Sequence, residues 1–378
     1  MMRVAMNGTA LLSPLTGIGQ YTFHLAQGLA ARSDVDLNLF YAAMWSREVR
    51  QRPLPSIGPI KTLIKRMVPF AYELHHAISQ SKFTAGVRSF SSDVYHEPNF
   101  LAFKCDRPSV ITVHDLSWLR FPHTHPKERV RAMDRYFEPG LRRASVILTD
   151  SEFVRGEVLD VFGLPAERVI TVPLGVEGLF HPRAEEQCRA VLSAQSLQYG
   201  QYLLAVGTLE PRKNLSMALE AFSRLPAALR KRNPLVLAGM KGWHTSAMER
   251  QMAPMVAAGE VRVLGYLARD ELATITAGAR AMVYPSIYEG FGLPPLEAMA
   301  CRVPTIVSNV SSLPEVVGDT GLLIDSQDVD GATEAMLRLL EDDALREEQA
   351  DKALARSAGF SWERCVEGTL DGYRRALS

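Results

Sequence analysis

Two glutamates, Glu289 and Glu297, lie eight positions apart in the stretch YEGFGLPPLEAMA (288–300). The two glycines between them free the backbone to fold around a ligand, and the two prolines suit the first turn of a helix. We therefore expect Glu289 in a loop and Glu297 on the first turns of the helix that follows. Such a loop can contact a sugar with Glu289, a phosphate with its amides and a ribose diol with Glu297, because a carboxylate accepts hydrogen bonds from vicinal hydroxyls. A plain helix N-terminus explains Glu297 but not the whole ordered stretch.

Two adjacent cations, Arg212 and Lys213, follow the apolar run YLLAVG (202–207) and precede a helix for which Asn214 is a suitable N-cap. Positive side chains at a helix start oppose the helix dipole, and an anionic ligand would remove that conflict. Arginine binds a diphosphate as a bidentate fork and lysine as a point charge. A solvated basic pair is the alternative, but the pattern favours a diphosphate site.

His114 and Asp115 directly follow another apolar run, SVITV (109–113), where the carboxyl end of a parallel strand would meet a cleft. A neutral histidine there could hydrogen-bond a sugar hydroxyl or transfer a proton, and a core histidine held by a backbone carbonyl is the alternative. Gly17 and Gly19 open a helix after the first strand, so backbone N–H groups could approach an anion closely. A plain tight turn would explain these glycines equally well.

The composition restricts the class of protein. A chain of 378 residues with 47% apolar residues can fill two cores, and its 42 basic and 42 acidic residues argue against binding duplex nucleic acid. Four dispersed cysteines fit a reducing compartment rather than a zinc site or disulfide framework. The sequence contains no recognisable secretory signal and no apolar run near the ~18 residues that span a bilayer. We therefore expect a cytoplasmic protein, which could still touch a membrane surface.

Short runs of Val, Ile and Leu alternate with helix-period segments such as 214–229 and 269–279, a rhythm typical of α/β proteins with parallel sheets. The polar stretch EGLFHPRAEEQ (177–187) separates two such series. We expect two Rossmann-like domains, 1–185 and 186–359, that face each other across a cleft, with 360–378 as a helix that returns to the first domain. The predicted strands are 2–6, 109–115, 145–150, 168–173, 202–207, 235–239, 261–265, 281–286 and 304–309.

The stretch 47–88 carries eight basic residues and only two acidic ones, with apolar residues interleaved. One interpretation is a solvated helix and loop that cover the sheet. The other is a patch for anionic lipid headgroups or for a phosphate-bearing acceptor.

The ordered stretch EGFGLPPLE, with GTLEPRKN (207–214) before it and SNVSSLPEVVGDTGLLID (308–325) after it, resembles the retaining glycosyltransferases of family 4, which have the GT-B fold. TGIGQYTFHL and ITVHDLSW resemble that family's glycine loop and cleft histidine. LAGMKGWH and VRVLGYLARDEL resemble its nucleotide-base region, and FSWERC resembles its returning helix. The resemblance covers nearly the whole chain and is strongest over 202–325.

This resemblance implies retaining transfer of a hexose from a nucleotide diphosphate sugar to a saccharide or lipid-linked acceptor in bacterial polysaccharide synthesis. Within the family, the chain is most similar to enzymes that use GDP-mannose or GDP-rhamnose as the donor. It implies that Arg212 and Lys213 neutralise the leaving diphosphate, and that Glu289 and His114 contact the transferred sugar. The donor-side residues would be Gly17, Gly19, Gly207, Lys241, Gly265, Tyr266, Phe291, Gly292, Leu293 and Glu297. The acceptor-side residues would be Tyr21, Asp115 and Trp118.

No DxD-type metal motif is suitably placed, so we expect neither a metal nor another cofactor. Retention allows two routes: a covalent intermediate on Glu289, or front-face attack in which a diphosphate oxygen takes the acceptor's proton. The resemblance favours the second. Two other functions stay open, namely a sugar-nucleotide epimerase, which needs no acceptor, and a non-catalytic nucleotide-sugar-binding protein, which needs neither His114 nor the two cations.

Overall fold

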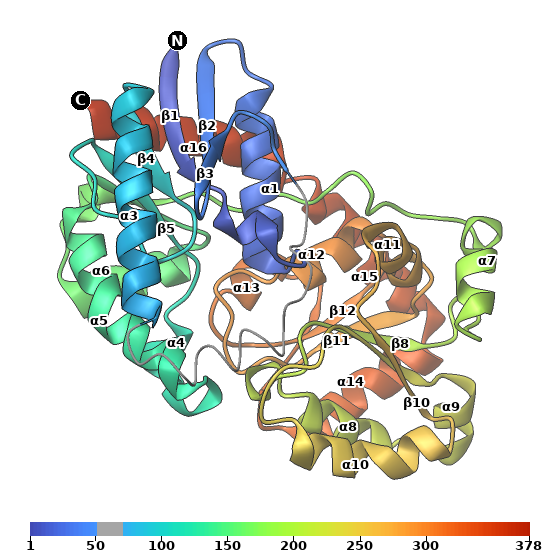
Figure 1. Cartoon of the computed structure of the whole chain (residues 1–378). Helices are drawn as coiled ribbons and strands as arrows, with labels where there is room; N and C mark the ends of the chain where they lie inside the picture. The colour runs from blue at the N-terminus through green and yellow to red at the C-terminus, as the bar shows by residue number, and fades with distance from the viewer. Residues whose placement is uncertain (51–70) are drawn as a thin grey trace.

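Two separate sheets with helices packed against them form the two halves of the protein in a computed structural model (Figure 1). The structure describes the backbone of residues 1–50 and 71–378, and the side chains of residues 1–50 and 78–378. The first sheet ends at Thr171 and the second begins at Leu203, so the chain passes between the halves once before its C-terminal helix.

The N-terminal sheet has seven strands in the order β3-β2-β1-β4-β5-β6-β7. All neighbours are parallel except β2 and β3, which pair antiparallel at the edge. Its strands are β1 (Met2–Asn7), β2 (Val35–Tyr41), β3 (Met44–Ser46), β4 (Val94–Glu97), β5 (Ser109–Val113), β6 (Val146–Thr149) and β7 (Val169–Thr171). Its helices are η1 (Thr9–Leu12), α1 (Gly17–Ala30), α3 (Ala71–Ser89), α4 (Ser117–Arg120), η2 (Pro122–Thr124), α5 (Lys127–Arg143), α6 (Glu152–Phe162) and η3 (Ala166–Arg168).

The C-terminal sheet has six parallel strands in the order β10-β9-β8-β11-β12-β13. These are β8 (Leu203–Val206), β9 (Leu235–Ala238), β10 (Val261–Gly265), β11 (Ala281–Tyr284), β12 (Thr305–Ser308) and β13 (Leu322–Ile324). The remaining helices are α7 (Glu185–Ala194), η4 (Pro211–Lys213), α8 (Leu215–Ser223), α9 (Ala227–Arg232), α10 (Ser246–Ala257), α11 (Arg269–Ala277), α12 (Leu293–Ala300), α13 (Leu313–Val317), α14 (Val329–Glu341), α15 (Asp343–Ser357) and α16 (Trp362–Leu377).

All nine predicted strands are present, and their buried Val, Ile and Leu side chains form the cores on either side of each sheet. The sequence prediction missed β2, β3, β4 and β13. The last of these has three residues, and β4 reads Val-Tyr-His-Glu, in which two polar side chains interrupt the apolar pattern. The antiparallel edge pair also departs from the expected all-parallel sheet.

The last helix, α16, leaves the C-terminal half and packs against α1, β4, β5 and β6, which confirms the predicted return (Figure 1). Its buried face includes Cys365, Leu370 and Tyr373. Helix α1 accommodates it through Gly28, because a Cβ at that position would overlap the Val366 side chain. The Tyr373 hydroxyl also bonds His96 Nδ1 at 2.7 Å. The C-terminal helix is therefore part of the N-terminal core.

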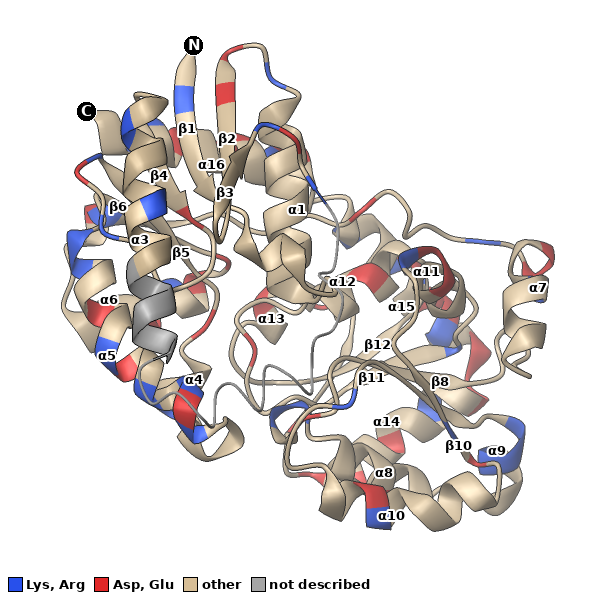
Figure 2. Ribbon diagram, in the orientation of Figure 1, with Lys and Arg blue, Asp and Glu red and all other residues tan. Residues whose placement is uncertain are grey.

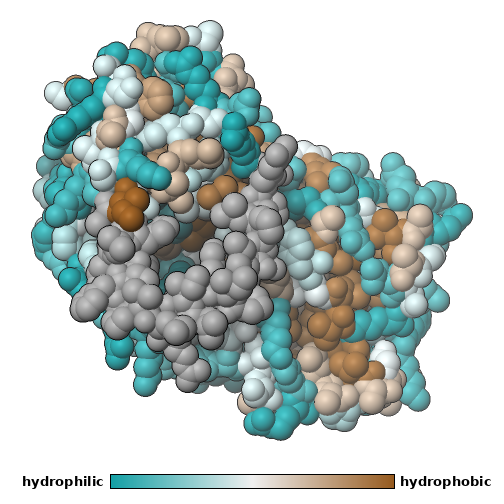
Figure 3. Space-filling view, viewed as in Figure 1, coloured by the Kyte–Doolittle hydropathy of each residue, from teal (hydrophilic) through white to brown (hydrophobic). Residues whose placement is uncertain are grey.

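Basic and acidic residues alternate along the ribbon in the described parts of both halves (Figure 2), and the chain has zero formal net charge. On the face in Figure 3, hydrophobic side chains gather over the C-terminal half. Its edge strand β10 carries Val263, which is 43% exposed. Within 1–50 and 71–378, no helix combines the length and the apolar character that crossing a bilayer requires.

The basic stretch 47–88 lies partly outside the described residues. Arg52, Lys61, Lys65 and Arg66 belong to that part, together with the interleaved apolar residues 60–68. Of the basic residues whose side chains are described, Arg47 pairs with Asp36, Arg50 with Glu48 and Arg88 with Asp106. A membrane or acceptor role for this stretch stays a prediction.

The packing of α16 predicts that the variant Leu370→Ala loses about 2–5 kcal/mol of unfolding free energy, because the side chain is only 1% exposed and its removal leaves a cavity. Urea denaturation measures this loss. The matched control is Leu377→Ala on the same helix, where the side chain is 43% exposed and we expect a change within about 0.5 kcal/mol. Equal stabilities of the two variants would mean that α16 does not support the fold.

Candidate active site

A cavity of about 570 Å³ lies between the two halves and is lined by residues of both. The carboxyl ends of β5 and β6 border it on one side, and those of β8, β9 and β11 on the other. This is where open parallel sheets bind ligands. The predicted residues that line it are Gly17, His114, Asp115, Gly207, Arg212, Lys213, Lys241, Tyr266, Glu289, Phe291, Gly292, Leu293 and Glu297.

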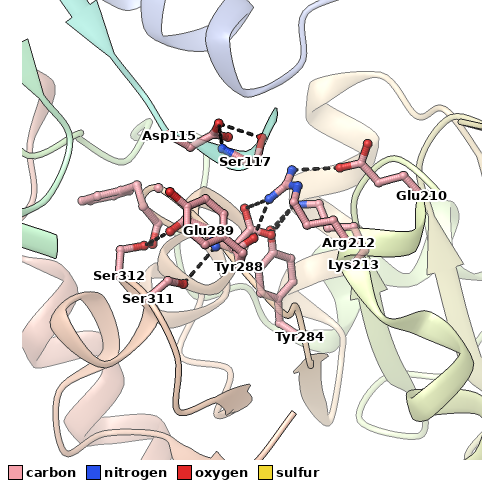
Figure 4. Close-up of polar contacts among 12 residues, drawn as sticks. Asp115, Ser117, Glu210, Arg212, Lys213, Tyr284, Tyr288, Glu289, Ser311 and Ser312 are labelled. Carbon is pink, nitrogen blue, oxygen red and sulfur yellow. Dashed lines mark hydrogen bonds and ion pairs between the residues drawn. The ribbon is translucent and has the colours of Figure 1, made fainter. Parts of the chain in front are cut away.

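Glu289 is the centre of a buried ionic cluster on the C-terminal wall (Figure 4). Its Oε2 accepts a hydrogen bond from Arg212 at 2.9 Å, and its Oε1 accepts from Lys213 Nζ at 2.6 Å and from the Tyr284 hydroxyl at 2.9 Å. Arg212 also donates to Glu210 Oε1 at 2.8 Å. The side chains of the four charged residues are between 7% and 13% exposed. The cluster therefore holds two cations and two carboxylates with little access to water.

Burial alone would raise the pKa of Glu289, but the charges of Arg212 and Lys213 outweigh it and lower this pKa to about 2. Burial has the opposite effect on the Lys213 ammonium and lowers its pKa, against the attraction of Glu289. The pKa of Arg212 is raised, since the nearby carboxylates more than compensate for its burial. Glu289 is thus ionised at neutral pH.

The loop that carries Glu289 is fixed from both halves. Ser312 Oγ bonds the carbonyl oxygens of Glu289 and Phe291 at 2.9 Å each, and Ser151 Oγ donates to the Gly290 carbonyl at 2.8 Å. Gly290 lies so close to the N-terminal half that a Cβ there would overlap the His114 carbonyl oxygen. Gly292 has φ 114°, which favours glycine. The two glycines thus allow a close approach and a left-handed turn.

Tyr288 also joins the two halves. Its hydroxyl accepts from the Leu116 backbone N–H at 2.9 Å and bonds the Glu157 carboxylate, while its carbonyl oxygen accepts from Arg212 at 2.6 Å. The segment that positions Glu289 is therefore anchored on the opposite wall.

His114 is buried and both of its ring nitrogens have partners. Nδ1 lies 2.7 Å from Asp150 Oδ2, and Nε2 lies 2.8 Å from the Pro98 carbonyl oxygen. Burial lowers the pKa of His114, but the charge and hydrogen bond of Asp150 outweigh this effect and raise it. A carbonyl oxygen can only accept, so Nε2 donates to Pro98, and Nδ1 is occupied by Asp150. Neither ring nitrogen is therefore free for a sugar hydroxyl in this geometry, which differs from the expected sugar contact. Asp115 beside it lines the cavity and accepts from the backbone and hydroxyl of Ser117.

Four of the predicted residues do not line the cavity. Tyr21 is 2% exposed, bonds Thr112 Oγ1 at 2.8 Å and packs edge-on against His114 with ring centroids 4.9 Å apart. Trp118 is 4% exposed and packs against Phe137. Both aromatics are buried in the N-terminal half, and their role on the acceptor side stays a prediction. Gly19 is the third residue of α1, and Gly265 ends β10 with φ 69°.

Helices α1 and α12 begin where the sequence predicts, but Asn214 does not cap α8 as expected. Helix α1 begins at Gly17 and α12 at Leu293, and both residues line the cavity. The second and third residues of α12 are prolines, so of its first three residues only Leu293 has a backbone N–H to offer. Asn214 does occupy the N-cap position of α8. However, it has φ 55° and its Nδ2 donates to the carbonyls of Pro285 and Ser326, at 3.0 and 2.7 Å, instead of capping the helix. It ties the Arg212-Lys213 turn to the loop that follows β11.

Several residues of the site were missed from the sequence. Glu210 and Tyr284 complete the ionic cluster, and Asp150 holds His114. Arg269, at the start of α11, binds Glu297 Oε1 at 2.8 Å and also bonds Glu177. Asp150 directly follows β6 and Tyr284 ends β11, positions that they share with many residues that have no role. Glu210 and Arg269 lie four residues beyond the ends of β8 and β10. Among the described residues, no group of three or more His, Cys, Asp or Glu side chains is arranged to hold a metal ion.

Comparison with known proteins gives two family matches and full-length relatives. The family described as "Glycosyl transferases group 1" matches residues 195–356, and "Glycosyltransferase Family 4" matches residues 15–177. The O-antigen chain mannosyltransferase B of Escherichia coli is 38% identical over 99% of this chain and 100% of its own.

Two solved structures share the fold over nearly their whole lengths. The sucrose-phosphate synthase of Thermosynechococcus elongatus has a TM-score of 0.74 at 20% identity and covers 99% of this chain and 98% of its own. The Anabaena protein Alr3699/HepE, in complex with UDP and glucose, has a TM-score of 0.73 at 15% identity, with coverages of 98% and 99%. Two facing α/β units with the cavity between them define the GT-B class of glycosyltransferase folds. The chain belongs to glycosyltransferase family 4, and it is a glycosyltransferase.

The lowered pKa of Glu289 predicts that its ionised form stabilises the fold. Its contribution is complete above the ordinary value of 4.5 and is lost as the pH falls toward 2. We expect the variant Glu289→Gln to lose about 3 kcal/mol of unfolding free energy at pH 7, and less at pH 3.5. Chemical denaturation at the two pH values measures this. The control is Glu186→Gln in an exposed pair with Arg189, which should change stability by less than about 0.5 kcal/mol at pH 7. A loss independent of pH would contradict the assignment.

Proposed function

We propose that this protein is a retaining mannosyltransferase that moves a hexose from a GDP-linked donor to a saccharide or lipid-linked acceptor in polysaccharide synthesis, at the cytoplasmic face of a membrane. The name of the full-length relative, an O-antigen chain mannosyltransferase, supports the sugar and the pathway class. The sequence motifs PRKN (211–214) and GIGQYT (17–22) support the GDP-linked donor. The observation that carries the chemistry is the buried pair of cations, Arg212 and Lys213, on one wall of the interdomain cavity.

Transfer begins with cleavage of the bond between the anomeric carbon and the phosphate oxygen, which leaves negative charge on the diphosphate. A guanidinium and an ammonium already held in place stabilise that charge without reorganisation, and their burial strengthens the interaction. In this role Arg212 and Lys213 replace the metal ion that other transferases use.

The charges already in the cluster determine what else must contribute. Arg212 and Lys213 are balanced by Glu210 and Glu289 before a donor binds. A diphosphate therefore adds negative charge that needs further donors. The first N–H groups of α1, beside Gly17, and the backbone N–H of Leu293 at the start of α12 can supply them, since a helix N-terminus attracts an anion. The donor would thus be held between peptide dipoles of both halves and the two side-chain cations.

The contacts of Glu289 support the front-face route over a covalent one. Both carboxylate oxygens already accept hydrogen bonds, one from Arg212 and the other from Lys213 and Tyr284. Formation of a glycosyl ester would remove the charge that these donors stabilise. Glu289 is better suited to hold the cations and to contact the sugar, while the leaving diphosphate oxygen takes the acceptor's proton.

The variants Arg212→Ala and Lys213→Ala should each lower kcat by about 10²- to 10³-fold, with donor KM changed less than about tenfold, because the charge they stabilise develops only in the transition state. Steady-state kinetics on both substrates separate the two effects. The control Arg224→Ala removes an exposed arginine of the same half and should keep wild-type kinetics. Near-normal turnover of both Arg212→Ala and Lys213→Ala would contradict the proposal that these cations stabilise the leaving diphosphate.

The donor itself is tested with labelled GDP-mannose, UDP-glucose and UDP-N-acetylglucosamine, each with a lipid-linked oligosaccharide acceptor, with and without EDTA. We expect transfer from GDP-mannose, retention of the anomeric configuration by NMR, and equal rates in EDTA. An isomerised donor without acceptor would identify an epimerase, and tight binding without turnover would identify a binding protein. Loss of activity in EDTA, restored by a divalent cation, would contradict the metal-independent mechanism, and a glycosyl adduct trapped on Glu289 would exclude the front-face route.

A further inference from the structure

Arg269 connects the donor side of the cavity to the segment between the two halves. It is the first residue of α11 and lines the cavity. Its Nη2 donates to Glu297 Oε1 at 2.8 Å and lies 3.1 Å from Glu177 Oε2, to which Nε also donates. Its guanidinium lies over the Phe180 ring, 4.5 Å from the centroid. Glu177 and Phe180 belong to the connecting segment, so the position of this arginine is determined on three sides.

The partner of Arg269, Glu297, is a carboxylate in a poor environment for charge. Its side chain is 7% exposed, on the first turns of α12, where it lines the cavity. A buried carboxylate without a cation takes up a proton. Among the described residues, Arg269 is the only lysine or arginine in an ion pair with Glu297.

The hydrogen bond from Arg269 uses only one of the two carboxylate oxygens. It ends on Oε1, and no hydrogen bond from the described part of the chain reaches Oε2. An ionised carboxylate held in this way keeps acceptor capacity for hydroxyl groups of a ligand in the cavity. A protonated one would lose part of that capacity.

We propose that Arg269 is a positioning residue for donor recognition, which keeps Glu297 ionised and oriented so that its free oxygen can accept hydrogen bonds from the ribose diol of the donor nucleotide. This inference rests on the proposed function, in which Glu297 binds the ribose. It gives Arg269, which the motif resemblance over 261–272 did not single out, and the connecting segment a part in nucleotide binding.

The titratable and charged groups that face Glu297 are Arg269 on α11, Glu177 on the connecting segment, His24 on α1 and Cys301, which directly follows α12. Burial raises the pKa of Glu297, Arg269 opposes this rise, and Glu177 adds to it. Without Arg269 the pKa of Glu297 rises further, so a smaller fraction of the carboxyl group is ionised at a given pH, and its charge returns as the pH increases. The effect of removing Arg269 must therefore decrease with rising pH.

The experiment measures nucleotide binding by calorimetry at pH 6.5 and pH 9. Wild type, Arg269→Met, Arg269→Lys and Glu297→Gln are titrated with the best-binding of GDP, UDP and ADP, and with its 2′,3′-dideoxy form. We expect Arg269→Met to weaken binding about tenfold or more at pH 6.5 and clearly less at pH 9, and Arg269→Lys to restore most of the affinity. The dideoxy nucleotide, which lacks the diol, should bind wild type and Arg269→Met equally. Glu297→Gln should bind weakly at both pH values.

The matched control is Arg230→Gln, which removes a partly buried arginine paired with Glu260 at 3.0 Å in the same half, away from the cavity. It should bind like wild type. If Arg269→Met loses the same affinity at both pH values, or loses it equally for the dideoxy nucleotide, Arg269 is only structural and the inference fails while the proposed function stands. If Glu297→Gln binds like wild type, or if no nucleotide binds, the proposed ribose site fails as well.

Discussion

The ion pairs that Glu289 makes with Arg212 and Lys213 are the interaction on which the rest of the site depends. Charges buried to this degree are stable only when each is paired, and here each has an ion-pair partner. The partners come from two turns that lie 76 or more positions apart. Asn214 ties these turns together through the carbonyls of Pro285 and Ser326. The requirement for charge pairing thus determines the shape of the loops that follow β8 and β11.

The same loop makes the two halves interdependent. Gly290 contacts the backbone at His114, Ser151 bonds its carbonyl, and Tyr288 reaches Leu116 and Glu157. Farther along, Glu315 Oε1 and Oε2 accept from the first N–H groups of α6, at Glu152 and Phe153. Since these bonds cross between the halves, an opening of the cavity must break them together. The residues that fix the loop of Glu289 are therefore also among the ones that hold the two halves together.

Local patterns account for what the sequence could predict. The apolar runs gave nine strands and the glycine-proline order gave the loop and start of α12, because both depend on neighbours in the chain. Strands β4 and β13 were missed since their polar or very short sequences form strands only through pairing. The aromatic pair Tyr21 and Trp118 was placed at the acceptor wall from motif position alone, whereas both are core residues. The role of Arg269 could not be predicted from the sequence, because it depends on a hydrogen bond to the carboxylate of Glu297, 28 positions away.

On the proposed function, the carboxylate of Glu289 explains how two buried cations stay charged before a diphosphate binds. Without a counter-ion, burial would favour loss of the Lys213 proton, and the guanidinium of Arg212 would turn toward water. With Glu289 in place both side chains keep their charge and direction before the donor arrives, so no reorganisation is needed when charge develops on the leaving group. The cost is that a bound diphosphate shares its cations with Glu289. The N–H groups at the start of α1 and the single N–H of Leu293 at the start of α12 offset this cost, which is why a site of this kind needs both walls of the cavity.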